Sequence, residues 1–193
     1  MTKAISTSLL DYARIYKNAI PQDVSDEILK NLRNIEYNQH TFYNYKTNED
    51  HAISGDKELD VSFSDSYRNE QLEKIIWDII YHYVESLDMP WFSGWQGFSL
   101  PRWNKYKETR QMALHADRIK SLFDGERKGD PTLTVLGLFR TEFTGGEFIM
   151  WEDDHKLDYD PGDIIVFPSN FMYPHKVEPV TSGERHSFVS WVW

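Results

Sequence analysis

Hydrophobic residues in the first ninety positions recur every three or four residues, which is the period of an amphipathic helix. We predict one helix after the N-cap candidates at residues 23–26 and a second from Asn69 to just before Pro90. The hydrophobic positions are Ile28, Leu29, Leu32 and Ile35 in the first helix and Leu72, Ile75, Ile76, Ile79, Ile80, Tyr83, Val84 and Leu87 in the second. Both stripes indicate helices that pack against a larger core.

From residue 91 the pattern changes to short runs of β-forming residues separated by turn signals such as Gly145-Gly146 and Asp160-Pro161-Gly162-Asp163. The candidate strands are residues 98–106, 112–117, 133–139, 147–151, 164–167, 173–177 and 185–193. Short strands at this spacing favour a β-sandwich or a jelly roll. The pattern therefore predicts an α+β protein in which helices precede strands.

Length and composition are those of one globular domain. The chain has 193 residues, of which 40% are hydrophobic and 15% aromatic, and it contains no cysteine. We expect a single domain in which residues 1–90 are mainly helical support and loops and residues 91–193 form the β core. Polar segments at 47–60 and 119–131 lack hydrophobic periodicity, and we expect them to act as solvated loops that order over a site. The start of the chain shows no apolar run typical of a signal or membrane segment, so we expect a cytoplasmic protein without a membrane partner.

Net charge argues against one class of partner. The formal charge is -10 at pH 7, whereas a nucleic-acid groove needs clustered Lys and Arg. The basic residues between 118 and 128 are interrupted by acidic ones, which is typical of a solvated loop. We therefore expect no nucleic-acid partner.

The most specific chemical signal is His115-Ala116-Asp117 together with His175. Residues i and i+2 of a strand point to the same face, so His115 and Asp117 can converge on one ion. His175 lies 58 residues beyond Asp117 and can supply a third ligand from another strand. Two histidines and one carboxylate form the set that holds a non-haem Fe(II) and leaves coordination positions open.

Arg185 and Ser187 follow the third ligand by ten and twelve residues. A guanidinium group donates two parallel hydrogen bonds to a carboxylate, which suits the binding of a dicarboxylate beside the metal. Residues 135, 136, 188, 189 and 191 are candidates for the apolar wall of such a pocket, although alternation alone does not decide which of them face inward.

These motifs, in this order, resemble the 2-oxoglutarate- and Fe(II)-dependent oxygenases, in the branch of prolyl 4-hydroxylase-like proteins, and look like small bacterial and bacteriophage members. The resemblance covers about residues 100–193. Beside the histidines, it rests on Phe143-Thr144-Gly145-Gly146-Glu147-Phe148, on Pro161 to Ser169, on Pro174-His175-Lys176-Val177, on Pro179 to Arg185 and on Trp191. If the chain is viral, the host cytoplasm is the expected location.

The resemblance implies a double-stranded β-helix, or jelly roll, with supporting helices on one sheet. It implies His115, Asp117 and His175 as catalytic iron ligands, and Arg185, Ser187 and Tyr106 as residues that bind 2-oxoglutarate. Cofactors would be Fe(II), 2-oxoglutarate and O2, with ascorbate as a further candidate. Several relatives have a tyrosine on the strand before the Gly-Gly turn; this chain has Leu138 there, so that hydrogen bond is expected to be missing.

The expected activity is hydroxylation of a second substrate coupled to decarboxylation of 2-oxoglutarate. A prolyl residue in a peptide or protein is the first candidate, accepted by a groove lined by aromatic residues from Trp91 to Trp103 and by Tyr43 or Tyr45. A free amino acid or small metabolite is the alternative, with Arg118, Lys105 and Glu108 as its nearest charged partners. A different class would be a silent jelly-roll binding module, which has no need for the metal ligands and Arg185 together.

Overall fold

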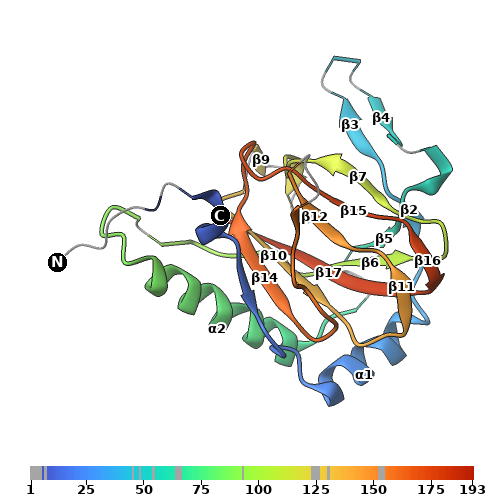
Figure 1. Cartoon of the computed structure of the whole chain (residues 1–193), viewed down its shortest axis with the longest axis horizontal. Coiled ribbons are helices and arrows are strands. Elements are labelled where there is room, and N and C mark those ends of the chain that lie inside the picture. The colour runs from blue at the N-terminus through green and yellow to red at the C-terminus, as the bar shows by residue number, and fades with distance from the viewer. Residues whose placement is uncertain are drawn as a thin grey trace.

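The computed structural model describes residues 6, 8–44, 46–47, 49–53, 55–63, 67–92, 94–122, 127–129, 131–151 and 155–193. Two sheets face each other across an apolar core, and two helices cover the outer face of the larger sheet (Figure 1). The strand pairs are antiparallel, and their arrangement is consistent with a jelly-roll core. Within the described residues, neither helix is both long enough and hydrophobic enough to span a bilayer.

The larger sheet contains strands from both halves of the chain. In spatial order its strands are β1 (Arg14–Tyr16), β14 (Ile164–Pro168), β10 (Leu133–Leu138), β17 (Arg185–Val192), β6 (Arg102–Tyr106), β5 (Asp60–Ser62) and β2 (Asn38–Gln39). Three of the seven precede residue 91, so residues 1–90, which were expected to be mainly helical support and loops, also supply strands of this sheet. These three strands, of which β1 and β2 form the edges of the sheet, are two or three residues long, too short for a periodicity of two to be recognised.

The smaller sheet carries the candidate metal ligands. Its order is β13 (His155–Lys156), β12 (Phe148–Met150), β15 (His175–Val177) and β7 (Met112–His115). Other strands form two-stranded pairs. Two are hairpins, β3 (Phe42–Asn44) with β4 (Glu49–His51) and β8 (Ile119–Leu122) with β9 (Arg127–Gly129), and the third joins β11 (Phe143–Gly145) to β16 (Val180–Gly183), which lies far along the chain. The segment 119–131 was expected to be a loop; its described parts instead form the β8–β9 hairpin. Short 3-10 turns, η1 (Leu9–Tyr12) and η2 (Gly55–Lys57), complete the elements.

Helix α2 (Glu70–Leu87) lies where its hydrophobic stripe predicts it. The Asn69 side chain accepts a hydrogen bond from the Leu72 amide at 2.8 Å, which satisfies one of the free donors of the first turn. At the other end Asp88 takes a left-handed conformation with φ of 52° and ends the helix before Pro90. Its buried residues pack on Trp103, Val135 and other outward-facing positions of the larger sheet.

Helix α1 (Gln22–Leu32) begins one residue before the predicted cap region, after Pro21. Ser25, which the sequence offers as an N-cap candidate, is fully buried instead, and its hydroxyl accepts a hydrogen bond from the Arg140 amide at 3.1 Å. Proline is tolerated at position 21 because the first amides of a helix have no partner within the helix in any case.

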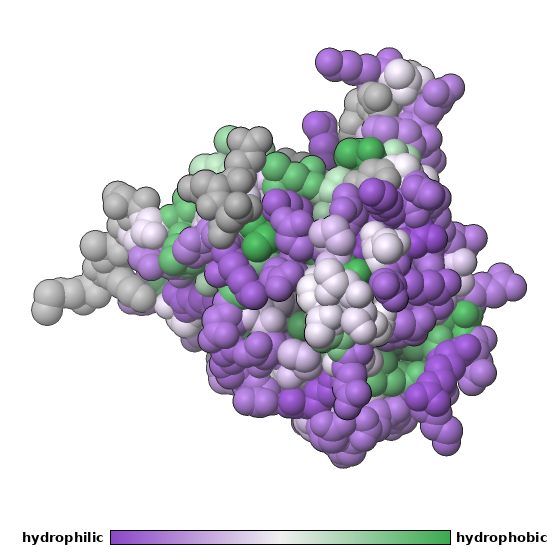
Figure 2. All heavy atoms as spheres, turned by 45° about the vertical axis from the view of Figure 1, so that its right-hand side comes forward, coloured by the Kyte–Doolittle hydropathy of each residue, from purple (hydrophilic) through white to green (hydrophobic). Residues whose placement is uncertain are grey.

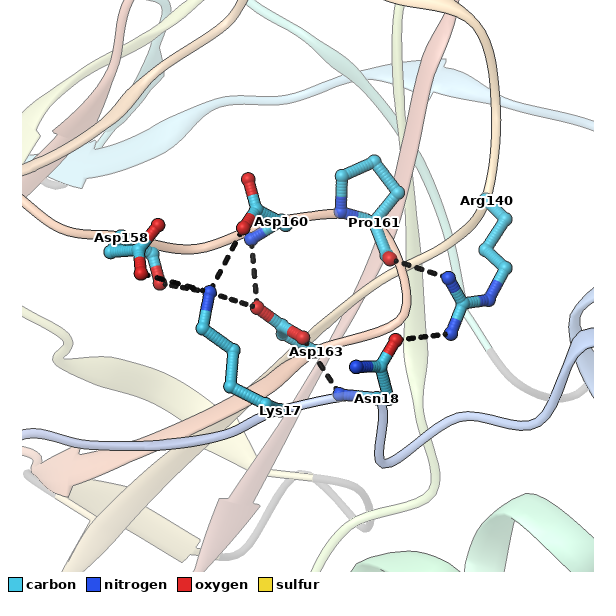
Figure 3. Close-up of polar contacts among 7 residues, drawn as sticks. All are labelled: Lys17, Asn18, Arg140, Asp158, Asp160, Pro161 and Asp163. Atoms are coloured by element: carbon cyan, nitrogen blue, oxygen red, sulfur yellow. Dashed lines mark hydrogen bonds and ion pairs between the residues drawn. The ribbon is translucent and has the colours of Figure 1, made fainter.

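A polar network joins the start of the chain to the turn before β14 (Figure 3). Asp163, which is 1% exposed, accepts hydrogen bonds from the amides of Asn18 at 2.8 Å and Asp160 at 2.9 Å. Lys17 lies 3.0 Å from the same carboxylate, and Arg140 donates to the Asn18 side chain at 3.0 Å. This network holds β1 against β14 at the edge of the larger sheet.

The surface agrees with the acidic composition. Figure 2 shows a face on which hydrophilic side chains predominate and hydrophobic ones form separate patches. The β3–β4 hairpin extends away from the body of the protein on this side (Figures 1 and 2).

Candidate functional site

Three potential metal ligands converge between β7 and β15. His115 is the last residue of β7 and pairs with His175, the first residue of β15, and Asp117 follows two residues after the strand ends. Their ligand atoms all lie within 4.8 Å of one another, and His115 Nε2 is 3.5 Å from Asp117 Oδ1. The expected strand 112–117 thus stops at His115, but the predicted convergence of the three side chains is present.

Both imidazole rings are turned so that Nε2 faces the centre of this cluster. The Nδ1 atom of His115 lies 2.8 Å from the Ala113 carbonyl, and that of His175 lies 3.1 Å from the Tyr173 carbonyl. A carbonyl can only accept, so both Nδ1 atoms donate and both Nε2 atoms keep a lone pair. The Nε2 of His115 is buried and has no hydrogen-bond partner, as a ligand atom prepared for a metal would be.

Electrostatics favour the protonation states that a metal requires. Burial lowers the pKa of His175 to about 4, so its ring is neutral at physiological pH. Burial by itself would raise the pKa of Asp117, but the neighbouring imidazoles of His115 and His175 and the hydrogen bond from the Thr134 hydroxyl together hold this pKa well below its ordinary value. Two neutral imidazoles and one carboxylate fit a divalent cation such as Fe(II).

Residues outside the triad orient Asp117. The Thr134 hydroxyl, fully buried on β10, donates to Asp117 Oδ2 at 2.6 Å. The Ser169 hydroxyl lies 2.9 Å from the same Thr134 oxygen. The two hydroxyls leave Oδ1 of Asp117 directed to His115, so the carboxylate has one free oxygen for a metal. Neither Thr134 nor Ser169 was predicted from the sequence.

Arg185 is a buried cation beside this cluster. Its side chain is 2% exposed, donates from Nη1 to Ser187 Oγ at 3.1 Å, and lies with Cζ 4.9 Å from the Tyr106 ring centre. Its Nε is buried without a partner, and no carboxylate forms an ion pair with it within the described residues. A buried guanidinium is costly without an anion, so the arrangement fits an anionic ligand. The structure thus brings together Arg185, Ser187 and Tyr106.

The Gly145-Gly146 turn makes room for Arg185. Gly146 has φ of +66°, and a Cβ atom there would lie 2.9 Å from Arg185 Cδ. At Gly145, with φ of +73°, a Cβ atom would lie 2.4 Å from the Pro179 carbonyl oxygen. The pairing of β11 with β16 shifts register between Thr144 and Gly145, as expected for a bulge.

Tyr159 supplies a hydroxyl that the sequence did not indicate. It lies in the segment between β13 and β14, lines the cavity beside Arg185, and has a buried Oη without a partner. Burial raises its pKa well above the ordinary value, so it is a neutral donor. Leu138, at the position where relatives were expected to have tyrosine, is buried and does not line this cavity. Tyr159 therefore supplies, from a different segment, a hydroxyl donor that Leu138 cannot provide.

The cavity is narrow and lies between the two sheets. The residues that line it are Arg102, Asn104, Tyr106, Met112, His115, Asp117, Leu136, Phe148, Tyr159, His175, Val177, Arg185, Ser187 and Val189. Of the expected wall residues, Leu136 and Val189 face the cavity. Val135 and Phe188 point to the helices and belong to the core there, while Trp191 packs on Val189. Arg102 and Asn104 were not predicted.

The aromatic residues expected to line a substrate groove are absent from the lining of this cavity. Trp103 is fully buried against Phe139 under the helices, and Trp95 packs on Trp77 of α2, so this aromatic stretch does not line the cavity. The reason is strand alternation, which turns Trp103 away from the face that carries Arg102 and Asn104. Phe42 on β3 lies beside the candidate metal ligands, with its ring centre 5.2 Å from that of His115. Tyr45 lies outside the described residues.

The charged partners expected for a free amino acid are also elsewhere. Arg118, Lys105 and Glu108 are absent from the cavity lining. Lys105 alternates to the other face of β6, where its Nζ lies 4.0 Å from the ring centre of Tyr37. The cation that does reach the cavity from this strand is Arg102.

Comparison with known proteins agrees with this geometry. Residues 101–193 match the family described as the 2OG-Fe(II) oxygenase superfamily. A PKHD-type hydroxylase of Alteromonas mediterranea is 33% identical over 98 residues, which cover 48% of this chain and 42% of the relative. The chain therefore spans less than half the length of that curated relative.

Solved structures share the fold over nearly the whole chain. A Pseudomonas putida prolyl-4-hydroxylase has a TM-score of 0.63 and 18% identity, covering 94% of this chain and 91% of its own. A Trichoplax adhaerens prolyl hydroxylase in complex with a hypoxia inducible factor peptide fragment has a TM-score of 0.65 and 15% identity, covering 94% and 83%. The matched sequence contains the whole candidate metal-ligand cluster and Arg185, so this part of the chain is similar to the 2OG-Fe(II) oxygenase superfamily.

Proposed function

We propose that the protein is a 2-oxoglutarate-dependent Fe(II) dioxygenase that hydroxylates a second substrate. The single observation that carries this proposal is the pairing of a convergent His115, Asp117 and His175 cluster with a buried Arg185 that has no anionic partner in the described part of the chain. A silent binding module would need neither feature. In a stable protein, both are explained by ligands that complete them.

His115, Asp117 and His175 would hold the iron. The Nδ1 hydrogen bonds of the two histidines fix their rings, and the hydrogen bond from Thr134 fixes the carboxylate of Asp117. Bound there with 2-oxoglutarate and O2, Fe(II) supplies oxidative decarboxylation of the keto acid to succinate and CO2, coupled to insertion of one oxygen atom into a C–H bond. Ascorbate stays part of the proposal as the reductant that keeps the iron active.

Arg185, Ser187, Tyr106 and Tyr159 would bind the distal carboxylate of 2-oxoglutarate. Arg185 donates from Nε and Nη atoms, and the two tyrosines are neutral because burial raises their pKa. Apolar residues close the cavity around this end, among them Leu136, Phe148 and Val177. They exclude water, which strengthens the ion pair between Arg185 and the ligand.

Binding of 2-oxoglutarate tests this assignment directly. With Mn(II) in place of Fe(II), calorimetry should show 2-oxoglutarate binding that Arg185→Ala weakens by about 30-fold or more, because it leaves a buried carboxylate unpaired. Arg33→Ala is a matched control, since Arg33 is exposed at the end of α1. Arg185→Lys keeps the charge without the planar fork and should retain part of the affinity.

Metal binding tests the assignment of the ligand cluster. His175→Ala should lose most of its Mn(II) affinity, whereas His82→Ala, an exposed histidine on α2, should bind the metal normally. Unchanged Mn(II) affinity in His175→Ala, or unchanged 2-oxoglutarate affinity in Arg185→Ala, would show that the site is wrongly assigned.

For the second substrate, a prolyl residue of a peptide or protein is the proposal that the structural relatives support, since one of them is a prolyl hydroxylase with a bound peptide. The alternative is a free amino acid or small metabolite. Arg102 is the observation that favours the alternative.

A further inference from the structure

Arg102 is a second buried cation, at a different place in the same cavity. It lies on β6 and is 7% exposed. Its Nε donates to the Asn104 side chain at 3.0 Å, and its Cζ lies 5.1 Å from the ring centre of Trp191. The contacts on Nε and on the guanidinium face hold the side chain in one orientation and leave the terminal nitrogens for another partner.

No carboxylate forms an ion pair with Arg102 in the part of the chain that the structure describes. Asp117 interacts with it electrostatically, but Asp117 is hydrogen-bonded to Thr134 and directed to His115. Glu58, the other buried carboxylate nearby, interacts with Tyr106 and does not line the cavity. Among the described residues, Asp117 is therefore the only anion in the cavity lining, and it is already engaged by Thr134, so Arg102 has no ion-pair partner there.

The sheet separates Arg102 from Arg185. In the pairing of β6 with β17, Arg102 faces Val189 and Tyr106 faces Arg185, four residues farther along. At about 3.3 Å per residue this places the two positions roughly 13 Å apart along the strand. Arg102 is also the arginine that acts electrostatically on His40, His175 and Asp117. Arg102 therefore lies at the end of the cavity that contains the candidate metal ligands, which we call the metal end, and Arg185 lies at the opposite end.

Charge balance shows what is missing. With Fe(II) bound, the ionised groups that line the cavity are the metal, Asp117, Arg102 and Arg185, which sum to three positive charges. A bound 2-oxoglutarate dianion reduces this sum to one. One further carboxylate would neutralise the enclosed site, and Arg102 is the side chain positioned to receive it.

We propose that Arg102 binds a carboxylate of the molecule that is hydroxylated, so that the substrate is a free carboxylic acid of amino-acid size rather than an internal residue of a peptide. This inference rests on the dioxygenase function proposed above and specifies its substrate class. The carboxylate lies near the metal, and the carbon to be hydroxylated is a few bonds away from it. An internal peptide residue has an amide at that position and would leave Arg102 unpaired.

The keto acid itself is the other source of a carboxylate at the metal end. Bound as the proposed function requires, its C1 carboxylate and keto oxygen would be matched by the metal that His115, Asp117 and His175 would hold, which leaves the substrate as the better partner for Arg102. Arg102→Gln distinguishes the two sources, because it removes the charge and keeps a polar side chain. If Arg102 binds the substrate, the affinity for 2-oxoglutarate stays within about threefold of wild type.

The experiment uses the full chain loaded with Mn(II) and 2-oxoglutarate, which does not turn over. Calorimetry measures binding of free L-amino acids including L-proline, their carboxamides including L-prolinamide, and a capped peptide with an internal prolyl residue. We expect at least one free acid to bind, its amide to bind about 30-fold more weakly, and Arg102→Gln to remove this preference. Arg102→Lys should restore part of it. Lys105→Gln removes a charge from the other face of the same strand and should leave binding unchanged.

Each alternative result counts against the proposal. It is overturned if no free acid binds, if amides or the capped peptide bind as well as the acids, or if Arg102→Gln weakens 2-oxoglutarate instead of the acid. A thermal melt of each variant separates loss of folding from loss of binding. Failure of the dioxygenase function would look different, since 2-oxoglutarate would then bind without any dependence on Mn(II) or Arg185.

Discussion

At the residue scale, each side chain of the site has some polar atoms hydrogen-bonded to the protein and other polar atoms left free for a ligand. The two Nδ1 atoms donate to backbone carbonyls, Asp117 accepts from Thr134, and Arg185 donates to Ser187. The atoms left over are the ones that a metal and a dicarboxylate need. Such preorganisation means that a residue outside the ligand set can control affinity.

Thr134→Val tests this control. Valine keeps the shape of the buried side chain but removes the 2.6 Å hydrogen bond to Asp117, so the carboxylate loses its fixed orientation. Metal affinity, measured by Mn(II) titration, should fall 10- to 100-fold. Thr144→Val is the control, because it removes an exposed hydroxyl contact with Thr181 far from the triad. Equal Mn(II) affinity in the two variants would mean that Thr134 does not orient the ligand.

At the element scale, the edge strand β1 depends on polar contacts as well as on packing. It pairs only with β14 among the described strands, and the Asp163 network lies at its end (Figure 3). Since β1 has three residues, its ladder contributes few hydrogen bonds. A buried carboxylate that binds two amides compensates for that shortness.

Asp163→Ala should therefore destabilise the protein substantially. It leaves the amides of Asn18 and Asp160 without their acceptor, and each charge-assisted hydrogen bond contributes about 1.5–3 kcal/mol. We expect the free energy of unfolding in urea to fall by about 3 kcal/mol. Asp158→Ala removes an 84% exposed partner of the same Lys17 and should stay within about 0.5 kcal/mol of wild type. Comparable losses in both variants would contradict a special role for the buried carboxylate.

At the scale of the whole molecule, burial keeps several histidines neutral. Lowering the pH should therefore destabilise the fold, because the unfolded chain takes up protons that the buried histidines do not. Burial lowers the pKa of His40 to about 2 and also lowers that of His186. The unfolded chain binds these protons near pH 6.5, so stability is present above that pH and is lost as the pH falls below it.

Between pH 7.5 and pH 5, the metal-free protein should lose about 2 kcal/mol of unfolding free energy through His40 alone. Urea denaturation in the presence of a chelator measures the loss. His40→Gln should flatten the dependence, whereas His82→Gln, which changes an exposed histidine, should leave the slope as it is. A wild-type protein that is equally stable at both pH values would disprove a buried, neutral His40.

Much of the architecture could be predicted because its patterns are local. The α2 stripe and the core strands β6, β10, β14, β15 and β17 follow hydrophobic periodicity, and the metal ligands and Arg185 were recognisable from their spacing and motif order. The short strands β1, β2 and β5 were missed because two or three residues show no period, and their pairing is set by distant partners.

The sequence alone indicated which residue types could hold a metal and a carboxylate, since the chemistry of His, Asp and Arg and strand alternation are local properties. Only the tertiary structure decided which polar side chains share the cavity. Arg102 and Trp103 are adjacent in sequence, yet Arg102 lines the cavity with the candidate metal ligands and Trp103 lies under the helices. Tyr159 reaches Arg185 from a segment with no repeating pattern. These placements depend on register and on contacts between segments far apart in the chain, which no local pattern of residues encodes.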